Sequence, residues 1–537
     1  MKSSFLVWAA FIAAPLTMQA ASADGVAAQD TDAKIKNLET QIQELSKQID
    51  DLKQSAARKA AEDRMQREET EAKAAPAPKD AVKVSLKNGR PAIASADGNF
   101  TAEIRALMQF DAAYYQQNAA AKGLPASYGP DLSSGGNFRR AQIGLRGTLF
   151  GDWSYNFTYD FGGSAVETGG HIYTAYLQYD GLAPFALRIG AYAPPAGIED
   201  GTSASDLMFL ERNSPANLAR SITGSPGRDA VSAIYAGKRL FAAVSLTGGK
   251  VQDSAVYDEQ QAVLGRVSGL LYDDKDFSLL VGANGTYVFK LPDAAANDAG
   301  GRHSVKLSDY PELAVDSTAS KLVNTGSLAA DHYAMWGLEA AGRFRNVYAQ
   351  GGYFAYYVDR TQTAYTAFTG PGASDTVVVH PGDDRFSGWY LQASWTLTGE
   401  PRTYNAANGA FAMPKPARPF SLKNGGWGAW ELAARYSRLD LNDRAEDTAS
   451  VITGWTGAGS KTYTYYNTVR GGKQKAATIG LNWYPNRAVR FLLDYQWIDI
   501  DRLQTPGTVT TTGISGLPAV LADQKVQMLS LRTQIAM

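Results

Sequence analysis

The side chains that most often carry out catalysis or bind metals are scarce in this chain of 537 residues. It has no Cys and only four His, at His171, His303, His332 and His380. Without Cys there can be no thiolate zinc site, no disulfide scaffold and no cysteine nucleophile. A hydrolase would need a Ser or Asp close to a His, yet His171 and His332 fall in widely separated segments. We therefore expect no metal, no cofactor and no enzymatic activity.

Arginine is the residue type whose placement could carry a function. A forked guanidinium group can replace part of an anion's hydration shell, so a ring of Arg inside a channel favours anion entry. The strand pattern described below directs Arg105, Arg140, Arg146, Arg188 and Arg435 to one face of the wall. Acidic residues lie on the same face, so a second interpretation stays open, in which these charges simply pair across the wall.

A second group of charged candidates falls in a long connection at about 193–228, between two expected strands. We expect this connection to fold inward as a constriction, because an open lumen of this size would be too wide to discriminate between solutes. Its candidates carry both signs: Glu199, Asp200, Glu211, Arg212, Arg220 and Arg228. A mixed-charge constriction creates a transverse field that orders polar solutes. It does not by itself make a strong phosphate trap.

The elements that must position these residues are β-strands. In the stretch 100–114 the even positions are apolar, whereas odd positions include Glu103, Arg105 and Asp111. One apolar and one charged face are typical of a strand between an oily and a wet phase. All aromatic residues except Phe5, Trp8 and Phe11 follow this point in the chain. Many lie near strand ends, as in the interfacial girdle of a membrane barrel.

The same alternation recurs in about sixteen segments, which predicts an all-β, up-and-down transmembrane barrel. The expected segments are 100–114, 138–150, 153–161, 171–179, 185–192, 229–236, 240–248, 261–272, 277–288, 333–343, 347–357, 385–397, 428–439, 474–484, 488–500 and 525–537. Short and long connections alternate between them, as with periplasmic turns and external loops. A soluble β-sandwich or β-helix is the alternative, but its core would be richer in Val, Ile and Leu than in aromatics.

The N-terminal part predicts export and self-association. Residues 1–23 have a basic start, an apolar stretch and a small-residue cleavage pattern, which indicates a signal peptide, with an uncleaved anchor as the alternative. Residues 24–75 predict a helix with a coiled-coil seam, the alternative being a solvated helix or disordered spacer. The seam residues alternate by three and four: Ile35, Leu38, Ile42, Leu45, Ile49 and Leu52. We expect a linker over 76–97 and the barrel over 98–537.

The charge balance limits what the barrel can bind. The chain has 52 Lys plus Arg against 53 Asp plus Glu, a formal charge of −1. This neutrality excludes the basic signature of a nucleic-acid partner. Any anion preference must therefore come from where the charges lie, because there is no surplus of positive charge.

Several short motifs make the chain resemble the phosphate-selective porin O and P family. They are Arg139 to Ala141, Gly144, Gly147 to Phe150, Asp152 with Trp153, Pro195, Gly197, Glu199, Phe209 to Arg212, Leu397 to Glu400, Arg402, Tyr404, Trp430 to Leu432, and Arg435 to Ser437. The resemblance implies a sixteen-stranded homotrimeric porin with an inward third loop and basic residues that draw anions in. Two features depart from that family pattern: the sequence ends in Met537 instead of an aromatic residue, and its balanced loops do not reproduce a dense basic ladder or lysine cluster.

We expect passive diffusion of small hydrophilic solutes through the outer membrane of a Gram-negative cell, with a preference for anions and phosphate among the candidates. With an even number of strands, the first and the last strand begin and end on the same side of the membrane. The coiled coil that precedes the first strand is therefore expected in the periplasm. The expected partners are two further copies of the chain, outer-membrane lipid and the solutes themselves. The alternative function is a structural tether, in which the coiled coil contacts the cell wall and the pore is secondary.

Overall fold

The structure, a computed structural model, divides into two compact units, residues 1–78 and 79–537. The residues described are 29–74, 82–87, 89–118, 131–164, 169–251, 258–293, 303–318, 320–361, 363–370, 373–379, 382–445, 450–456, 459–465, 469–504 and 520–537.

The first unit contains one long helix, α1 (Gln29–Ala74). Five of the expected seam residues have side chains that are at least half exposed: Leu38, Ile42, Leu45, Ile49 and Leu52. The expected signal peptide and the side chain of Ile35 lie outside the described part of the chain. No helix among the described residues is long and apolar enough to cross a membrane.

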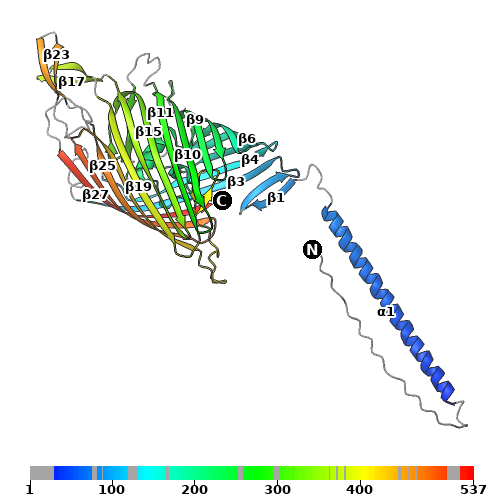
Figure 1. The fold of residues 1–537 in the computed structure, drawn as a ribbon. Helices are drawn as coiled ribbons and strands as arrows, with labels where there is room; N and C mark the ends of the chain where they lie inside the picture. The colour runs from blue at the N-terminus through cyan, green and yellow to red at the C-terminus, as the bar shows by residue number, and fades with distance from the viewer. Residues whose placement is uncertain are drawn as a thin grey trace. The chain divides into compact units, whose positions relative to one another are not determined.

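The second unit is a closed β-barrel of 16 antiparallel strands, which confirms the predicted fold class (Figure 1). Its strands are β3 (Thr101–Gln117), β4 (Gly135–Leu149), β5 (Trp153–Asp160), β6 (His171–Leu182), β7 (Phe185–Tyr192), β8 (Arg228–Ala236), β9 (Leu240–Lys250), β10 (Gln261–Asp273), β11 (Phe277–Lys290), β15 (Leu328–Phe344), β16 (Val347–Arg360), β19 (Asp384–Thr396), β22 (Ala429–Asp443), β25 (Val469–Tyr484), β26 (Val489–Gln504) and β27 (Val520–Ala536). Each strand pairs with the next in this order, and β27 closes the barrel on β3.

Side-chain alternation gives the wall two chemically different faces. On β3, the outward residues Ile104 and Tyr114 are exposed by 50% and 64%, whereas the inward residues Gln109 and Asp111 are fully buried. Successive side chains of a strand point to opposite faces, so each strand presents apolar groups to lipid and polar groups to the lumen.

Long and short connections alternate as expected, with one exception. Residues 397–428, between β19 and β22, lie on the side of the short turns, yet form a long segment that we call the turn-side segment. It contains a small hairpin, β20 (Thr403–Asn405) with β21 (Ala410–Ala412). Phe411 of this hairpin is 2% exposed and packs in one cluster with Ile198 and Phe209. The turn-side segment therefore enters the barrel. Two of the long loops also contain a β-hairpin. The loop between β16 and β19 contains β17 (Thr363–Gly370) paired with β18 (Ala373–Val379), and the loop between β22 and β25 contains β23 (Ser450–Thr456) paired with β24 (Gly459–Tyr465).

The stretch 76–97, predicted as a linker, instead contains a β-hairpin. Its strands are β1 (Val82–Lys87) and β2 (Arg90–Ser95), and β2 pairs with β3 through Ala92 opposite Glu103. Our prediction overlooked the alternation of Val82, Val84 and Leu86 with polar residues, because the strands are short and the preceding residues are rich in Ala and Pro. The barrel wall is thus extended at its turn side.

Two long connections fill much of the lumen. Residues 193–227 include α3 (Ile198–Gly201) and α4 (Ser214–Thr223), and residues 291–327 include β12 (Ser304–Val305), β13 (Ser308–Asp309) and β14 (Val323–Asn324). Helix α4 begins where the Asn213 side chain accepts a hydrogen bond from the Ala216 amide, and Pro215 occupies its first turn. Leu218 and Ile222 of α4 pack in a shared apolar cluster with Leu313 and Val323. The two connections therefore support each other inside the barrel.

Candidate functional site

Buried ion pairs fasten the connection 193–227 to the wall. Glu211 accepts two hydrogen bonds from Arg139, at 2.8 and 3.2 Å, and one from Arg532 at 3.1 Å. Arg532 also donates two 2.6 Å hydrogen bonds to Asp111. Burial alone would raise the pKa of Glu211, but Arg139, Arg140 and Arg532 lower it to about 2. Glu211 therefore acts as a charged anchor for this connection.

A β-bulge explains why two consecutive arginines contribute to this anchor. The β3–β4 pairing shifts between Gln109 and Phe110, so that Gln109 is opposite Arg140 whereas Phe110 is opposite Phe138. Arg139 is the extra residue, and both it and Arg140 are buried inside the barrel. Arg140 donates to Gln109 and lies 3.9 Å from Glu211. Strict alternation would have turned Arg139 outward, which is why our sequence analysis did not select it.

Other inward arginines are paired in the same way. Arg266 binds Glu339 at 2.9 Å, and Glu339 in turn accepts from the Ile198 amide at 2.7 Å. Arg402 of the turn-side segment donates two hydrogen bonds to Glu431, at 2.7 and 2.9 Å.

The predicted site residues Arg435 and Glu199 are also held by partners inside the barrel. Arg435 Nη2 lies 2.6 Å from Glu312 Oε2, and Arg435 Nη1 donates to the Glu211 carbonyl. Glu199 accepts hydrogen bonds from Gln350 and Gln392 on the opposite wall. These groups serve as supports inside the lumen.

Within the part of the chain that the structure describes, two cavities lie between the filled part of the lumen and the wall formed by β3 to β9. The first has a volume of about 290 Å³ and the second, nearer the turn side, about 840 Å³. They share the lining residues Arg90, Arg105, Asn156, Arg188, Ser203, Ser205, Ile234, Ala407, Asn408, Ala536 and Met537. The two cavities are therefore parts of one passage, which we call the lateral passage.

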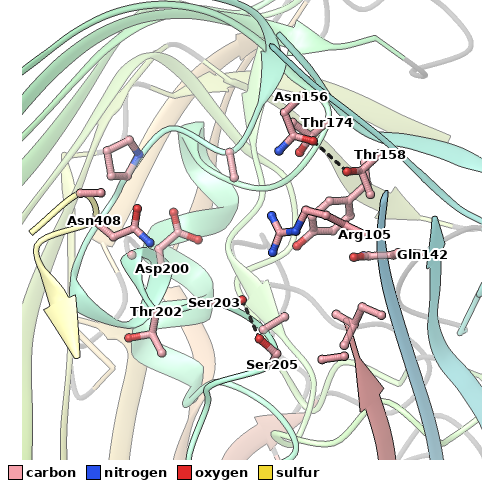
Figure 2. Close-up of a pocket in the computed structure, with 18 of the residues that line it drawn as sticks. Arg105, Gln142, Asn156, Thr158, Thr174, Asp200, Thr202, Ser203, Ser205 and Asn408 are labelled. Atoms are coloured by element: carbon pink, nitrogen blue, oxygen red, sulfur yellow. Dashed lines mark hydrogen bonds between the residues drawn. The ribbon is translucent and has the colours of Figure 1, made fainter. Parts of the chain in front are cut away.

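Arg105 and Arg188 lie on the wall of the lateral passage and line both of its cavities. Among the described residues, no carboxylate oxygen lies within the 4.0 Å ion-pair limit of Arg105 or Arg188. Arg188 donates to Gln178 at 2.7 Å and lies over the ring of Tyr176, 4.3 Å from its centroid. Figure 2 shows the Arg105 guanidinium pointing from the wall into the gap, with Asp200 on the opposite side. Among the described residues, these two guanidinium groups thus face the passage without an ion-pair partner.

The remaining charges beside the lateral passage are partly neutralised. Arg220 forms an ion pair with Asp200. Arg212 donates to the backbone carbonyls of Glu199 and Thr202, each at 3.0 Å. At the turn side, Glu103 accepts hydrogen bonds from both Arg90 and Arg146, at 3.0 and 2.9 Å. Glu103 is thus one acid shared by two arginines. Asp180 and Asp206 also line the second cavity, as do Lys415 and Arg487, so basic side chains outnumber acidic ones along the passage.

The structure separates the predicted site residues into two sets. Those that line the lateral passage are Arg105, Arg146, Arg188, Asp200, Arg212 and Arg220. Those that line neither of its cavities are Arg140, Glu199, Glu211, Arg228 and Arg435. Arg228, for example, donates to the carbonyls of Gly224 and Gly248 at 3.0 and 2.7 Å. Sequence reasoning missed Arg90, because it assigned that position to a linker.

Within the described part of the chain, no group of three or more His, Cys, Asp or Glu could hold a metal ion. A closed barrel with an apolar outer face, a charged lumen and an inward loop beside a residual passage is the architecture of an outer-membrane porin. The fold and the passage define a channel, with its wall in the outer membrane.

Comparisons with known proteins identify the family. The family model described as phosphate-selective porin O and P matches residues 113–516, and the chain belongs to this family. Porin O of Pseudomonas aeruginosa is 26% identical over 378 residues, which cover 68% of this chain and 77% of that protein. An uncharacterized protein of Caulobacter vibrioides is 25% identical over 446 residues, or 80% and 75% of the two chains.

Solved structures of outer-membrane proteins are also similar to this chain. An anion-selective porin from Comamonas acidovorans is 13% identical, with 82% of this chain and all of that chain covered and a TM-score of 0.42. OmpT of Vibrio cholerae is 8% identical, with 82% and 98% covered and a TM-score of 0.41.

Proposed function

We propose that this porin passes small hydrophilic solutes by passive diffusion and prefers anions. The main supporting observation is that Arg105 and Arg188 face the lateral passage and form no ion pair with a carboxylate in the part of the chain that the structure describes. A positive charge in a narrow, partly desolvated channel attracts anions and repels cations more strongly than the same charge in bulk water. Phosphate is a candidate solute, because the family is described as phosphate-selective and several arginine donors lie together here.

The reversal potential across a planar bilayer tests this preference. The full-length protein would be inserted into a membrane that separates two potassium chloride concentrations. A reversal potential of the sign set by chloride supports the proposal. A potential set by potassium would refute the anion preference, and the absence of conductance would refute the channel. Competition of millimolar phosphate with the chloride current then separates a specific site from a general channel.

The protein would assemble as a homotrimer, with α1 in the periplasm as a self-association element. The supporting observation is the row of exposed apolar side chains on α1, including Leu38, Leu45 and Leu52. A seam of this kind is stabilised only when a second helix covers it. Ile42→Asp together with Leu45→Asp should weaken chemical cross-linking between protomers, whereas Glu44→Asp, outside the seam, should not. Unchanged cross-linking of the seam variant would refute a role for α1 in association.

Contact of α1 with the cell wall would be a separate property of the same helix. Deletion of residues 30–75 should leave single-channel conductance unchanged, because no residue of α1 lines the lateral passage. Detachment of the envelope in cells that carry the deletion would support a tether. A normal envelope would refute it.

A further inference from the structure

The lateral passage is bordered by uncharged hydrogen-bonding groups as well as by arginines. Strands β4 to β6 contribute Gln142, Asn156, Thr158 and Thr174 on the same face as Arg105 (Figure 2). The connection 193–227 contributes the hydroxyl groups of Ser203 and Ser205, and the turn-side segment contributes Asn408. Neutral donors and acceptors therefore lie on both sides of the gap.

Several of these groups have no hydrogen-bond partner among the described residues. Thr158 donates to the Asn156 side-chain oxygen at 3.0 Å, which leaves the Asn156 amide nitrogen without a protein partner among the described residues. The hydroxyl of Thr174 and the side chain of Asn408 likewise form no hydrogen bond with described residues. Asn156 and Thr174 have intermediate exposure, so their free groups are open to a ligand.

The chemistry of these groups differs from what a bare inorganic anion requires. Inorganic phosphate at neutral pH carries one or two hydroxyl groups that can donate a hydrogen bond, and its other oxygens only accept. It can therefore use few of the acceptor oxygens that Asn and Gln side chains offer. A sugar hydroxyl both donates and accepts, and amide and hydroxyl side chains can satisfy both roles. Arginine satisfies the phosphate end of the same molecule.

The size of the passage also favours a ligand larger than inorganic phosphate. Its smaller cavity, of about 290 Å³, is close to the lower limit of roughly 300 Å³ for small-molecule sites. An inorganic phosphate ion fills only a small part of this volume. A larger anion can contact Arg105 on the wall while its hydroxyl groups reach the neutral groups on either side.

We propose that the lateral passage holds a subsite for hydroxyl-rich organic phosphates, with sugar phosphates as the ligand class. Arg105 and Arg188 would bind the phosphate group, and Asn156, Thr174 and Asn408 would bind the hydroxylated body. The proposal rests on the anion preference proposed above and names the solutes that the same passage favours over inorganic phosphate.

Current block in a planar bilayer tests the proposal with the full-length protein. Glucose 6-phosphate, inorganic phosphate and glucose would each be added to a chloride-conducting channel at matched ionic strength. Glucose 6-phosphate should half-block the chloride current at a concentration about fivefold lower than inorganic phosphate, as expected for one additional net hydrogen bond. Glucose, which lacks the phosphate, should block least.

Variants of the neutral groups separate this subsite from general attraction of anions. Asn156→Ala with Thr174→Val should raise the half-blocking concentration of glucose 6-phosphate to that of inorganic phosphate and leave the phosphate value unchanged. The matched control is Thr148→Val, because Thr148 lies on β4 with its hydroxyl bonded to Thr101 and lines neither cavity. This control should retain the fivefold difference.

The outcomes distinguish failure of the subsite from failure of the anion channel. Block by inorganic phosphate at an equal or lower concentration would overturn the subsite, and so would block by glucose 6-phosphate that the double variant does not change. In both cases a chloride-set reversal potential would leave the proposed anion preference intact. A potassium-set potential would instead refute the anion preference, and the subsite with it.

Discussion

The two sides of the barrel lumen use arginine in opposite ways. On the filled side, arginines are buried against carboxylates, as in the pair of Arg402 with Glu431, whose side chains are 2% and 0% exposed. On the open side, along the lateral passage, Arg105 and Arg188 have no carboxylate within ion-pair distance among the described residues. The same residue type thus fastens loops to the wall on one side and lines the passage on the other.

This difference shows that the number of inward arginines does not measure anion selectivity. A guanidinium that is buried against a carboxylate contributes little net field to a solute, because the two charges largely cancel. Selectivity depends on the few arginines whose partners are missing. Placement therefore produces a positive passage in a chain whose formal charge is −1.

The largest expected effect comes from breaking a pair on the filled side. Arg402→Met leaves the buried Glu431 carboxylate without its cation and should lower the free energy of unfolding by about 3–5 kcal/mol. Glu431→Gln should cost a similar amount, whereas the double variant should cost much less than the sum. Urea unfolding of the refolded protein in lipid vesicles measures each value. If the single losses simply add, Arg402 and Glu431 are not coupled.

A second test concerns Asp309, whose buried carboxyl group lies between the two lumen-filling connections. No cation of the described residues forms an ion pair with it. Burial raises the pKa of Asp309 to about 7, despite a hydrogen bond from Asn217 at 2.7 Å, and the nearby Glu312 also raises it. The unfolded chain loses this proton near its ordinary pKa of 3.8, so stability should fall as pH rises from about 4 to about 7.

Asp309→Asn should remove this fall and stabilise the protein at pH 8 by on the order of 1–3 kcal/mol. Unfolding midpoints at several pH values check the prediction. Asp316 in the same connection is the control, since hydrogen bonds, including one from Thr318, lower the pKa of Asp316 although its partial burial acts to raise it. Asp316→Asn should therefore destabilise at pH 8. Equal pH profiles for parent and Asp309→Asn would contradict the assignment.

On the open side, Arg105→Gln should reduce the chloride-to-potassium permeability ratio about fivefold, which corresponds to roughly 1 kcal/mol for one charge in a water-filled passage. Reversal potentials under a salt gradient give the ratio. Arg239→Gln is a matched control, because Arg239 is exposed on a short turn and lines neither cavity. An equal effect of the two substitutions would remove the special role of Arg105.

The smallest effect should come from Glu103→Gln. This substitution removes the carboxylate partner of Arg90 and Arg146, so that these arginines, like Arg105 and Arg188, lack an ion pair among the described residues. Loss of this carboxylate frees the charges of Arg90 and Arg146, so the chloride-to-potassium ratio should rise about twofold. The exposed mouth is well screened by salt, which limits the gain. A decrease in the ratio would mean that Glu103 serves mainly to position these arginines.

The barrel could be predicted from the sequence, because side-chain polarity must alternate from residue to residue in a strand that lies between lipid and water. The sixteen expected segments therefore match the observed strands closely. The two functions of arginine were not predictable, since pairing depends on where the loops travel. Nothing local to Arg435 reveals that Glu312, more than a hundred residues earlier, lies against it. The bulge at Arg139 was hidden for a related reason, because one extra residue breaks the very alternation that identifies a strand.

The β1–β2 hairpin also limits how the barrel can close. β2 and β27 pair with successive stretches of the same edge of β3: Ala92 is opposite Glu103, and Ala536 is opposite Leu107. A slip of β27 by one residue is excluded because it would turn the apolar face toward the lumen. A slip by two residues keeps every face correct, so alternation alone cannot prevent it. Toward the turn side, such a slip would carry Met537 from opposite Ala106 to opposite Ile104, directly next to the position that Ala92 of β2 occupies opposite Glu103. The hairpin therefore limits how far β27 can slip toward the turn side.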